Sequence, residues 1–163
     1  MKRKWHLLGF GLIGVLVLIQ CIRPDHTNPP IDASRTLQAR TQIPPQVEAM
    51  LQRSCNDCHS NQTVWPWYSQ MSPISWYLQY HVNEGRRELN FSDWATYDQR
   101  RAARKLKETC EQVETGAMPT RTYLWLHPSA ALSATDQQAI CAWARGERQR
   151  LEATQQSSLE PAR

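Results

Sequence analysis

Apolar residues recur at helical spacing in four stretches of the chain. Within each stretch the apolar positions lie three and four residues apart, which places them on one face of an α-helix. In chain order these positions are Val47, Met50 and Leu51; Ile74, Tyr77, Leu78, His81 and Val82; Ala102, Leu106, Cys110 and Val113; and Ala139, Ile140, Trp143 and Ala144. The pattern predicts a domain of the all-α class whose helices turn these faces inward.

Local signals predict where these helices begin and end. Pro45 suits the first turn of a helix, where no amide donor is needed. Ser72 and Ser92 are the expected N-caps of the second and third helices. Gly116 is expected to close the third helix from the left-handed conformation. The segment Ser133-Ala134-Thr135-Asp136 resembles a capping box and predicts the start of the last helix.

The N-terminus carries the pattern of an export signal. Lys2-Arg3-Lys4 precedes an apolar run at residues 7–19, which extends to residue 22 if two polar positions are tolerated. Because no convincing cleavage site follows, we expect an uncleaved signal anchor that crosses the bacterial inner membrane once, with its basic end in the cytoplasm. The alternatives are a lipoprotein acylated at Cys21 and a cleaved, soluble form.

The composition shifts along the chain define four parts. Residues 1–22 are the expected anchor, and residues 23–43, rich in Pro, Asn and Thr, are an extended linker or wrapping segment. Residues 44–150 hold the helical pattern, and residues 151–163 form a polar tail that we expect to be flexible. The rest of the chain, after the anchor, is expected on the periplasmic side.

Length and charge exclude several classes of protein. The chain has 163 residues, 40% of them hydrophobic, and a formal net charge of +4. That length suggests one domain, and the low hydrophobic fraction excludes a polytopic membrane protein. The basic excess is too small to favour nucleic-acid binding. Seven Trp are present, which suggests a core packed around a large flat group, and five Cys cannot all pair with one another.

The most specific motif is Cys55-Asn56-Asp57-Cys58-His59. This C-x-x-C-H spacing is the attachment signature of a c-type haem, in which Cys55 and Cys58 each form a thioether with a vinyl group. His59 then serves as the proximal ligand of the iron. A thioredoxin-like pair would need a βαβ pattern, a zinc site would need further ligands at metal spacing, and a simple disulfide would leave His59 without a role.

Met118 is the expected second axial ligand of the iron. It follows Gly116 and precedes Pro119, an arrangement by which cytochromes c present a thioether to iron. The alternatives are His81, on the apolar face of the second helix, then His127, and finally an iron with only five ligands. We expect a carbonyl in the aromatic segment Trp65–Ser69 to accept the proton on Nδ1 of His59.

Two further features point to roles outside the iron centre. Cys110 and Cys141 fall on inward helix faces, so they form either a disulfide or two buried free thiols. Basic residues outnumber acidic ones between positions 86 and 107, which would steer an acidic redox partner toward this surface. A solvated helix face, or counter-charges for the haem propionates, explains them equally well. The basic residues of this stretch are Arg86, Arg87, Arg100, Arg101, Arg104, Lys105 and Lys107.

Several tracts beyond C-x-x-C-H make the sequence resemble a known family. The matching tracts are Cys55–Ser60, Trp65–Ser69, Pro73–Trp76, His81–Arg86, Leu89–Ser92, Trp94, Met118-Pro119, Tyr123, Leu126–Pro128 and Leu132-Ser133. They resemble the haem-binding domain family of exported monohaem cytochrome c-like proteins, over about residues 45–145. The resemblance implies a cytochrome c-like helical fold that carries haem, and it implies no defined partner. Together with the C-x-x-C-H motif, it leads us to expect one covalent haem c.

Taken together, the sequence predicts a membrane-tethered c-type cytochrome that passes single electrons between redox partners. An iron with both axial positions filled leaves no site for a substrate, so we expect an electron carrier rather than an enzyme. The alternatives are a haem-based sensor or peroxidase-like enzyme with an open sixth position, and a fixed haem subunit of a larger oxidoreductase.

Overall fold

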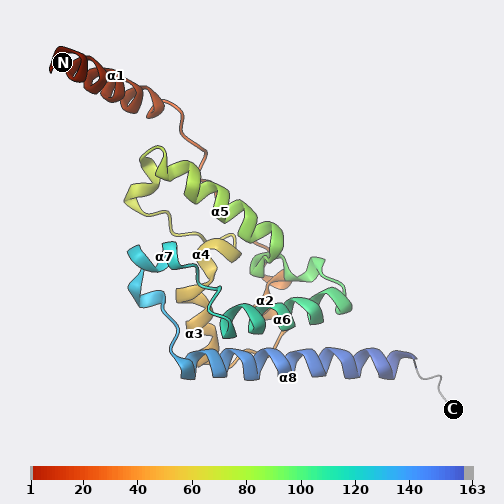
Figure 1. Ribbon diagram of the computed structural model, residues 1–163. Coiled ribbons are helices and arrows are strands. Elements are labelled where there is room, and N and C mark those ends of the chain that lie inside the picture. Colours follow the sequence, from red (N-terminus) through yellow and green to blue (C-terminus); the bar gives the residue numbers. More distant parts are fainter. Residues whose placement is uncertain (1, 160–163) are drawn as a thin grey trace.

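The computed structural model describes residues 2–159, and all regular secondary structure in that range is helical, which confirms the all-α prediction (Figure 1). The α-helices are α1 (Lys2–Ile19), α2 (Leu37–Arg40), α3 (Pro45–Ser54), α4 (Asn56–His59), α5 (Ile74–Glu88), α6 (Gln99–Glu114), α7 (Arg121–Leu126) and α8 (Ala134–Leu159). Short 3-10 helices join them: η1 (Ala33–Arg35), η2 (Trp67–Gln70), η3 (Phe91–Thr96) and η4 (Pro128–Ala130).

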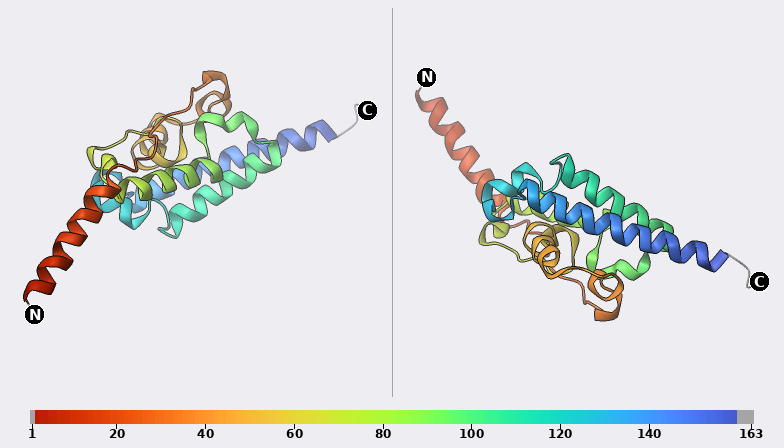
Figure 2. Two further views of the ribbon diagram at one scale, coloured as in Figure 1. Left: turned by 90° about the horizontal axis from the view of Figure 1, so that it is seen from above. Right: turned by 90° about the horizontal axis from the view of Figure 1, so that it is seen from below.

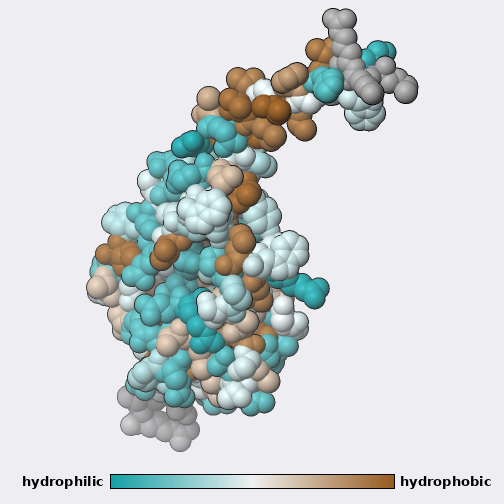
Figure 3. All heavy atoms as spheres, turned by 90° about the vertical axis from the view of Figure 1, so that its left-hand side faces the viewer, coloured by the Kyte–Doolittle hydropathy of each residue, from teal (hydrophilic) through white to brown (hydrophobic). Residues whose placement is uncertain are grey.

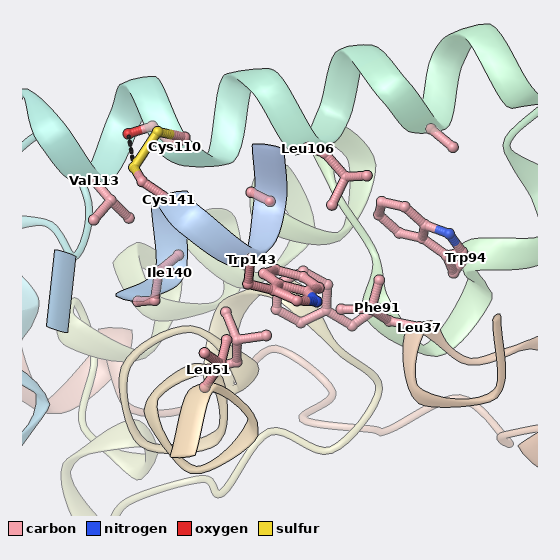
Figure 4. Close-up of a cluster of buried hydrophobic side chains, with 13 residues drawn as sticks. Leu37, Leu51, Phe91, Trp94, Leu106, Cys110, Val113, Ile140, Cys141 and Trp143 are labelled. Carbon is pink, nitrogen blue, oxygen red and sulfur yellow. Dashed lines mark hydrogen bonds between the residues drawn. A yellow bond between two sulfur atoms is a disulfide. The ribbon is translucent and has the colours of Figure 1, made fainter. Parts of the chain in front are cut away.

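The core lies between the antiparallel helices α6 and α8, with α3 packed against α8 (Figures 1 and 4). Its buried side chains are Leu37, Val47, Leu51, Phe91, Trp94, Ala102, Leu106, Cys110, Val113, Ile140, Cys141, Trp143 and Ala144. The inward faces expected for the third and fourth helices are all buried or half-buried here. The face expected on α5 differs, because Ile74 and Tyr77 are exposed and only Val82 is buried.

Two helices begin later than the sequence suggested. The helix expected from Ser92 starts at Gln99, and Asp98 caps it by accepting the amide of Arg101 at 2.7 Å. Ser92 lies in η3 instead, where its hydroxyl accepts the amide of Asn61 and is unavailable as a cap. Ser72 likewise precedes α5 by two residues. Serine competes for several local hydrogen bonds, so its presence alone does not locate a helix start.

Other helix ends lie where the sequence placed them. Pro45 is the first residue of α3. Gly116, at φ 69°, adopts the left-handed conformation just after α6. Ser133 and Asp136 bond reciprocally, with the Ser133 amide 3.0 Å from the carboxylate and the Asp136 amide 3.1 Å from the hydroxyl. These signals succeed because each satisfies backbone groups that a helix end leaves unpaired.

The N-terminal helix α1 projects away from the other helices, and its apolar side chains from Trp5 to Leu18 are exposed (Figures 1 and 2). Among the described residues, none of the helices combines the length and the apolar character needed to cross a bilayer.

The segment that follows α1 wraps the helical domain. Leu37 of α2 is buried in the core, so the core begins before the boundary expected at residue 44. Asn28 donates to the carbonyl of Thr63 and accepts from Arg86, whose guanidinium also bonds Ser60. These contacts hold a segment of polar composition against the domain surface.

The C-terminal helix continues beyond residue 150, where a flexible tail was expected. Leu151 packs on the core, its carbonyl accepts a hydrogen bond from the side chain of Gln99, and α8 runs on to Leu159. Residues 160–163 of the expected tail lie outside the described part. The packing of Leu151 therefore explains why the helix continues into a stretch of polar composition.

A disulfide between Cys110 and Cys141 joins α6 to α8 in the core (Figure 4). Their Cα atoms are 4.7 Å apart, within the usual range for such a bond. The sequence left open whether these cysteines form a disulfide or remain two free thiols, and in the structure they form the disulfide.

Candidate functional site

The C-x-x-C-H motif occupies a single helical turn. The chain bends at Cys55, between α3 and α4, and the carbonyl of Cys55 accepts the amides of Cys58 at 3.2 Å and His59 at 2.9 Å. This turn brings Cys55, Cys58 and His59 to the wall of one pocket. Two thiols and an imidazole thus lie together in the order that the motif predicts.

The pocket has a volume of about 690 Å³ and is lined mainly by apolar side chains. Its lining comes from α5, from the segment between Met118 and His127, and from residues 63–66, in addition to the motif itself. The volume falls within the range of about 300–1,000 Å³ that is usual for cofactor sites. The exposed face of α5 is explained by this pocket, since Ile74 and Tyr77 line it.

Helix α5 approaches α4 closely at Gly85. A β-carbon at this position would lie 2.9 Å from the carbonyl carbon of Cys58, and closer still to its oxygen. Only glycine permits this approach, because ordinary contacts of a β-carbon begin near 3.4 Å. Gly85 thereby sets the depth at which the motif helix sits beside the pocket wall.

The same contact orients His59. Its Nδ1 atom is 3.0 Å from the carbonyl oxygens of both Gly85 and Leu89, at the C-terminal end of α5. The expectation that the aromatic segment 65–69 supplies the acceptor is therefore wrong. A proton on Nδ1 shared with these carbonyls leaves Nε2 as the nitrogen with a free electron pair, as a metal ligand requires.

Burial sets the protonation states in the motif. It lowers the pKa of His59, which favours the neutral imidazole needed for metal binding. Burial raises the pKa of Cys55 to about 12 and that of Cys58 to about 11. A nucleophilic C-x-x-C pair needs the opposite shift, so the surroundings do not favour a thioredoxin-like role.

Met118 and the two alternative ligands line the same pocket. The turn at Gly116 directs the chain back so that the amide of Met118 bonds the carbonyl of Gln112 at 3.1 Å, and Met118 is half-buried. His81 packs edge-on against Tyr77, with ring centroids 4.1 Å apart.

Both nitrogens of the third candidate, His127, already have partners. Nε2 lies 3.2 Å from the hydroxyl of Tyr68, and Nδ1 lies 3.1 Å from the carbonyl of Tyr123. The imidazole also stacks on the Tyr123 ring at 4.1 Å. These contacts hold His127 in the wall and disfavour it as a ligand.

Sequence reasoning gave no role to two residues that shape the site, Asp57 and Tyr123. The Tyr123 hydroxyl donates to the Asp57 carboxylate at 2.7 Å, and the amide of Val64 donates to the same group at 3.0 Å. Burial, followed by the neighbouring Asp57 carboxylate, raises the pKa of Tyr123. Asp57 occupies a free position of the motif and Tyr123 lies far along the chain, so only the tracts of the family resemblance included these two residues, and without a role.

Four of the seven basic residues between positions 86 and 107 form ion pairs with acids. Arg87 bonds Glu84 at 2.6 Å, and Lys105 is buried and bonds Glu108 at 2.7 Å. Lys107 pairs with Glu111, and Arg101 lies over the ring of Tyr97. All three of these acids lie just outside the stretch first considered, which is why its basic excess overstated the charge available to a partner.

The lining of the pocket suits a large, flat, apolar group. Trp125 is 81% exposed, and Tyr80 and Leu126 are each 60% exposed, although all three face the pocket. Soluble proteins rarely expose such side chains together, unless something covers them. A haem would cover the lining, meet two thiols placed for thioether bonds, and find an oriented neutral imidazole.

Residues 14–146 match the family model described as haem-binding domain. The chain belongs to the haem-binding domain family. No curated protein and no solved structure is similar enough to count as a match. The matched range includes the wrapping segment, in keeping with the burial of Leu37 in the core of this haem-binding domain.

Proposed function

We propose that this haem-binding domain carries one haem c bound to Cys55 and Cys58, and that it transfers single electrons. The observation that carries the proposal is the placement of both thiols and His59 on one turn at the wall of an apolar pocket of about 690 Å³. The bound haem would supply a ferric–ferrous couple.

The chain's own residues would hold and tune that group. His59 would bind the iron through Nε2 while the carbonyls of Gly85 and Leu89 fix its ring. Met118 would fill the sixth position and favour the ferrous state, because thioether sulfur is a soft ligand. The aromatic wall formed by Tyr68, Tyr77 and Tyr123 would exclude water from the iron.

We further propose that the domain works at a membrane on the exported side of a bacterial cell. The support is the run of exposed apolar side chains along α1, from Leu7 to Leu18, preceded by a basic N-terminus. Exposed side chains of this kind are stabilised by lipid rather than by water. A redox partner would meet the domain there.

Covalent attachment is tested by the cysteine variants Cys55→Ala, Cys58→Ala and the double variant, with Cys21→Ala as the matched control. We expect haem to stay with the denatured wild-type chain and with Cys21→Ala under acid-acetone extraction. Each single variant should keep one thioether, and the double variant should lose its haem to the solvent. Haem extracted from the wild-type chain would contradict covalent attachment.

A further inference from the structure

Exposed apolar side chains gather at one end of the domain. Beyond residue 31, the large hydrophobic side chains exposed in the described part of the chain all fall within residues 64–80 and 125–126. They are Val64, Trp67, Met71, Ile74, Trp76, Tyr77, Tyr80, Trp125 and Leu126. Six of them line the pocket, where a haem would cover them. Trp67, Met71 and Trp76 lie outside the pocket, so a haem would not account for their exposure.

The composition of this region favours a lipid surface over a protein partner. No Asp, Glu, Lys or Arg occurs between Asp57 and Glu84, whereas Trp and Tyr are frequent there. Docking surfaces for transient redox partners carry charge, which steers the encounter. Trp and Tyr without charge are instead typical of the interface between the headgroups and the hydrocarbon of a membrane.

The base of α1 is fixed to this same surface. The side-chain amide of Gln20 bonds both backbone groups of Ser72, at 2.9 and 3.0 Å. The carbonyl of Ile22 accepts the indole Nε1–H of Trp76 at 2.7 Å and the hydroxyl of Ser72 at 3.2 Å. Figure 3 shows large pale aromatic side chains on the face just below the brown residues of α1.

We propose that Trp67, Met71 and Trp76 form a lipid-contacting surface that lies in the headgroup region beside α1. This inference rests on the membrane attachment proposed above and adds a fixed orientation to it. The four contacts between residues 20–22 and the start of α5 keep the domain from swinging freely on a tether. The rim of the pocket, which includes Ile74 and Tyr80, is then held close to the membrane surface.

The test uses the full-length holoprotein in lipid nanodiscs, with 5-fluorotryptophan in place of Trp. Single Trp→Phe variants assign the fluorine resonances. A nitroxide carried on the lipid headgroup should broaden the resonances of Trp67 and Trp76 as strongly as that of Trp5, which reports on α1. Trp143, 8% exposed and on the distant helix α8, is the internal control and should keep its intensity.

Two outcomes would overturn the inference, and they are distinguishable. If the Trp5 resonance broadens while those of Trp67 and Trp76 keep their intensity, as that of Trp143 does, then α1 contacts lipid but the domain does not. If Trp5 also keeps its intensity, the attachment through α1 fails, and the oriented surface fails with it. Haem content, measured on the same samples, reports on the haem binding in the proposed function independently of both.

Discussion

Replacing Gly85 with alanine tests the close approach of α5 to the motif helix α4. The added β-carbon would lie 2.9 Å from the carbonyl carbon of Cys58, short of the 3.4 Å at which ordinary contacts begin. The obstacle is backbone rather than a flexible side chain, so α5 must retreat by at least several tenths of an ångström. The carbonyl of Gly85, which holds His59, would move with it.

The size of the effect follows from two opposing contributions. Overpacking of this kind costs about 1–3 kcal/mol, and a backbone obstacle places Gly85→Ala at the upper end. Alanine has a higher helix propensity than glycine, which adds about 1 kcal/mol to the unfolding free energy. We therefore expect a net loss of about 2 kcal/mol in unfolding free energy. For a chain of this size that corresponds to a fall in Tm of roughly 4–8 °C.

Gly146 provides the matched control because it is also helical. A β-carbon there would meet nothing within 4 Å, so Gly146→Ala should stabilise the protein. The expected gain is about 0.5–1 kcal/mol. Urea unfolding of both holoproteins, followed by far-UV circular dichroism, measures the change in unfolding free energy of each variant, and the two changes should have opposite signs. A Gly85→Ala protein as stable as wild type, with unchanged haem absorption, would refute the close approach.

Three further variants test separate parts of the structure. Removing the disulfide with Cys110→Ala/Cys141→Ala should lower the unfolding free energy by about 2–4 kcal/mol, whereas Cys21→Ala should leave it unchanged in the same urea titration. Tyr123→Phe should cost about 1–2 kcal/mol near neutral pH through loss of the bond to Asp57. The pKa of Tyr123 is raised in the folded state, so the protonated hydroxyl contributes its full stabilisation below about pH 10 and loses it as the pH rises further. Above that pH, wild type should therefore lose stability more steeply than Tyr123→Phe. Arg86→Gln should lower the NMR order parameters of residues 26–28 by releasing the Thr27 carbonyl and the Asn28 side chain, while Arg87→Gln, whose partners lie on its own helix, should not; equal order parameters in both variants would contradict the role given to Arg86.

The faces of α6 and α8 could be predicted because helical periodicity is a local property. Leu106, Val113 and Ile140 are buried where their spacing placed them, because two amphipathic helices pack with their apolar faces toward each other. The start of α6 was missed because Ser92 and Asp98 are both good caps, and tertiary contact with Asn61 decided between them.

The acceptor of the His59 proton could not be predicted, because it depends on which helix packs against the motif. Gly85 and Leu89 lie 26 and 30 residues away in sequence, and nothing in the spacing marks their carbonyls. The burial of Leu37 was missed for a related reason: one apolar residue in a polar segment carries no periodic signal. Helical periodicity does not predict tertiary contacts that depend on a single residue.

Absorption spectra of the ferric and ferrous holoprotein test the central proposal most directly. Wild type should show the red charge-transfer band of methionine bound to ferric iron. Met118→Ala should lose that band, and His81→Ala should keep it. Met71→Ala, an exposed methionine outside the pocket lining, is the matched control and should also keep it. A high-spin wild-type spectrum, or rapid binding of carbon monoxide to the ferrous protein, would contradict the electron-carrier account and favour a sensor or enzyme with an open iron position.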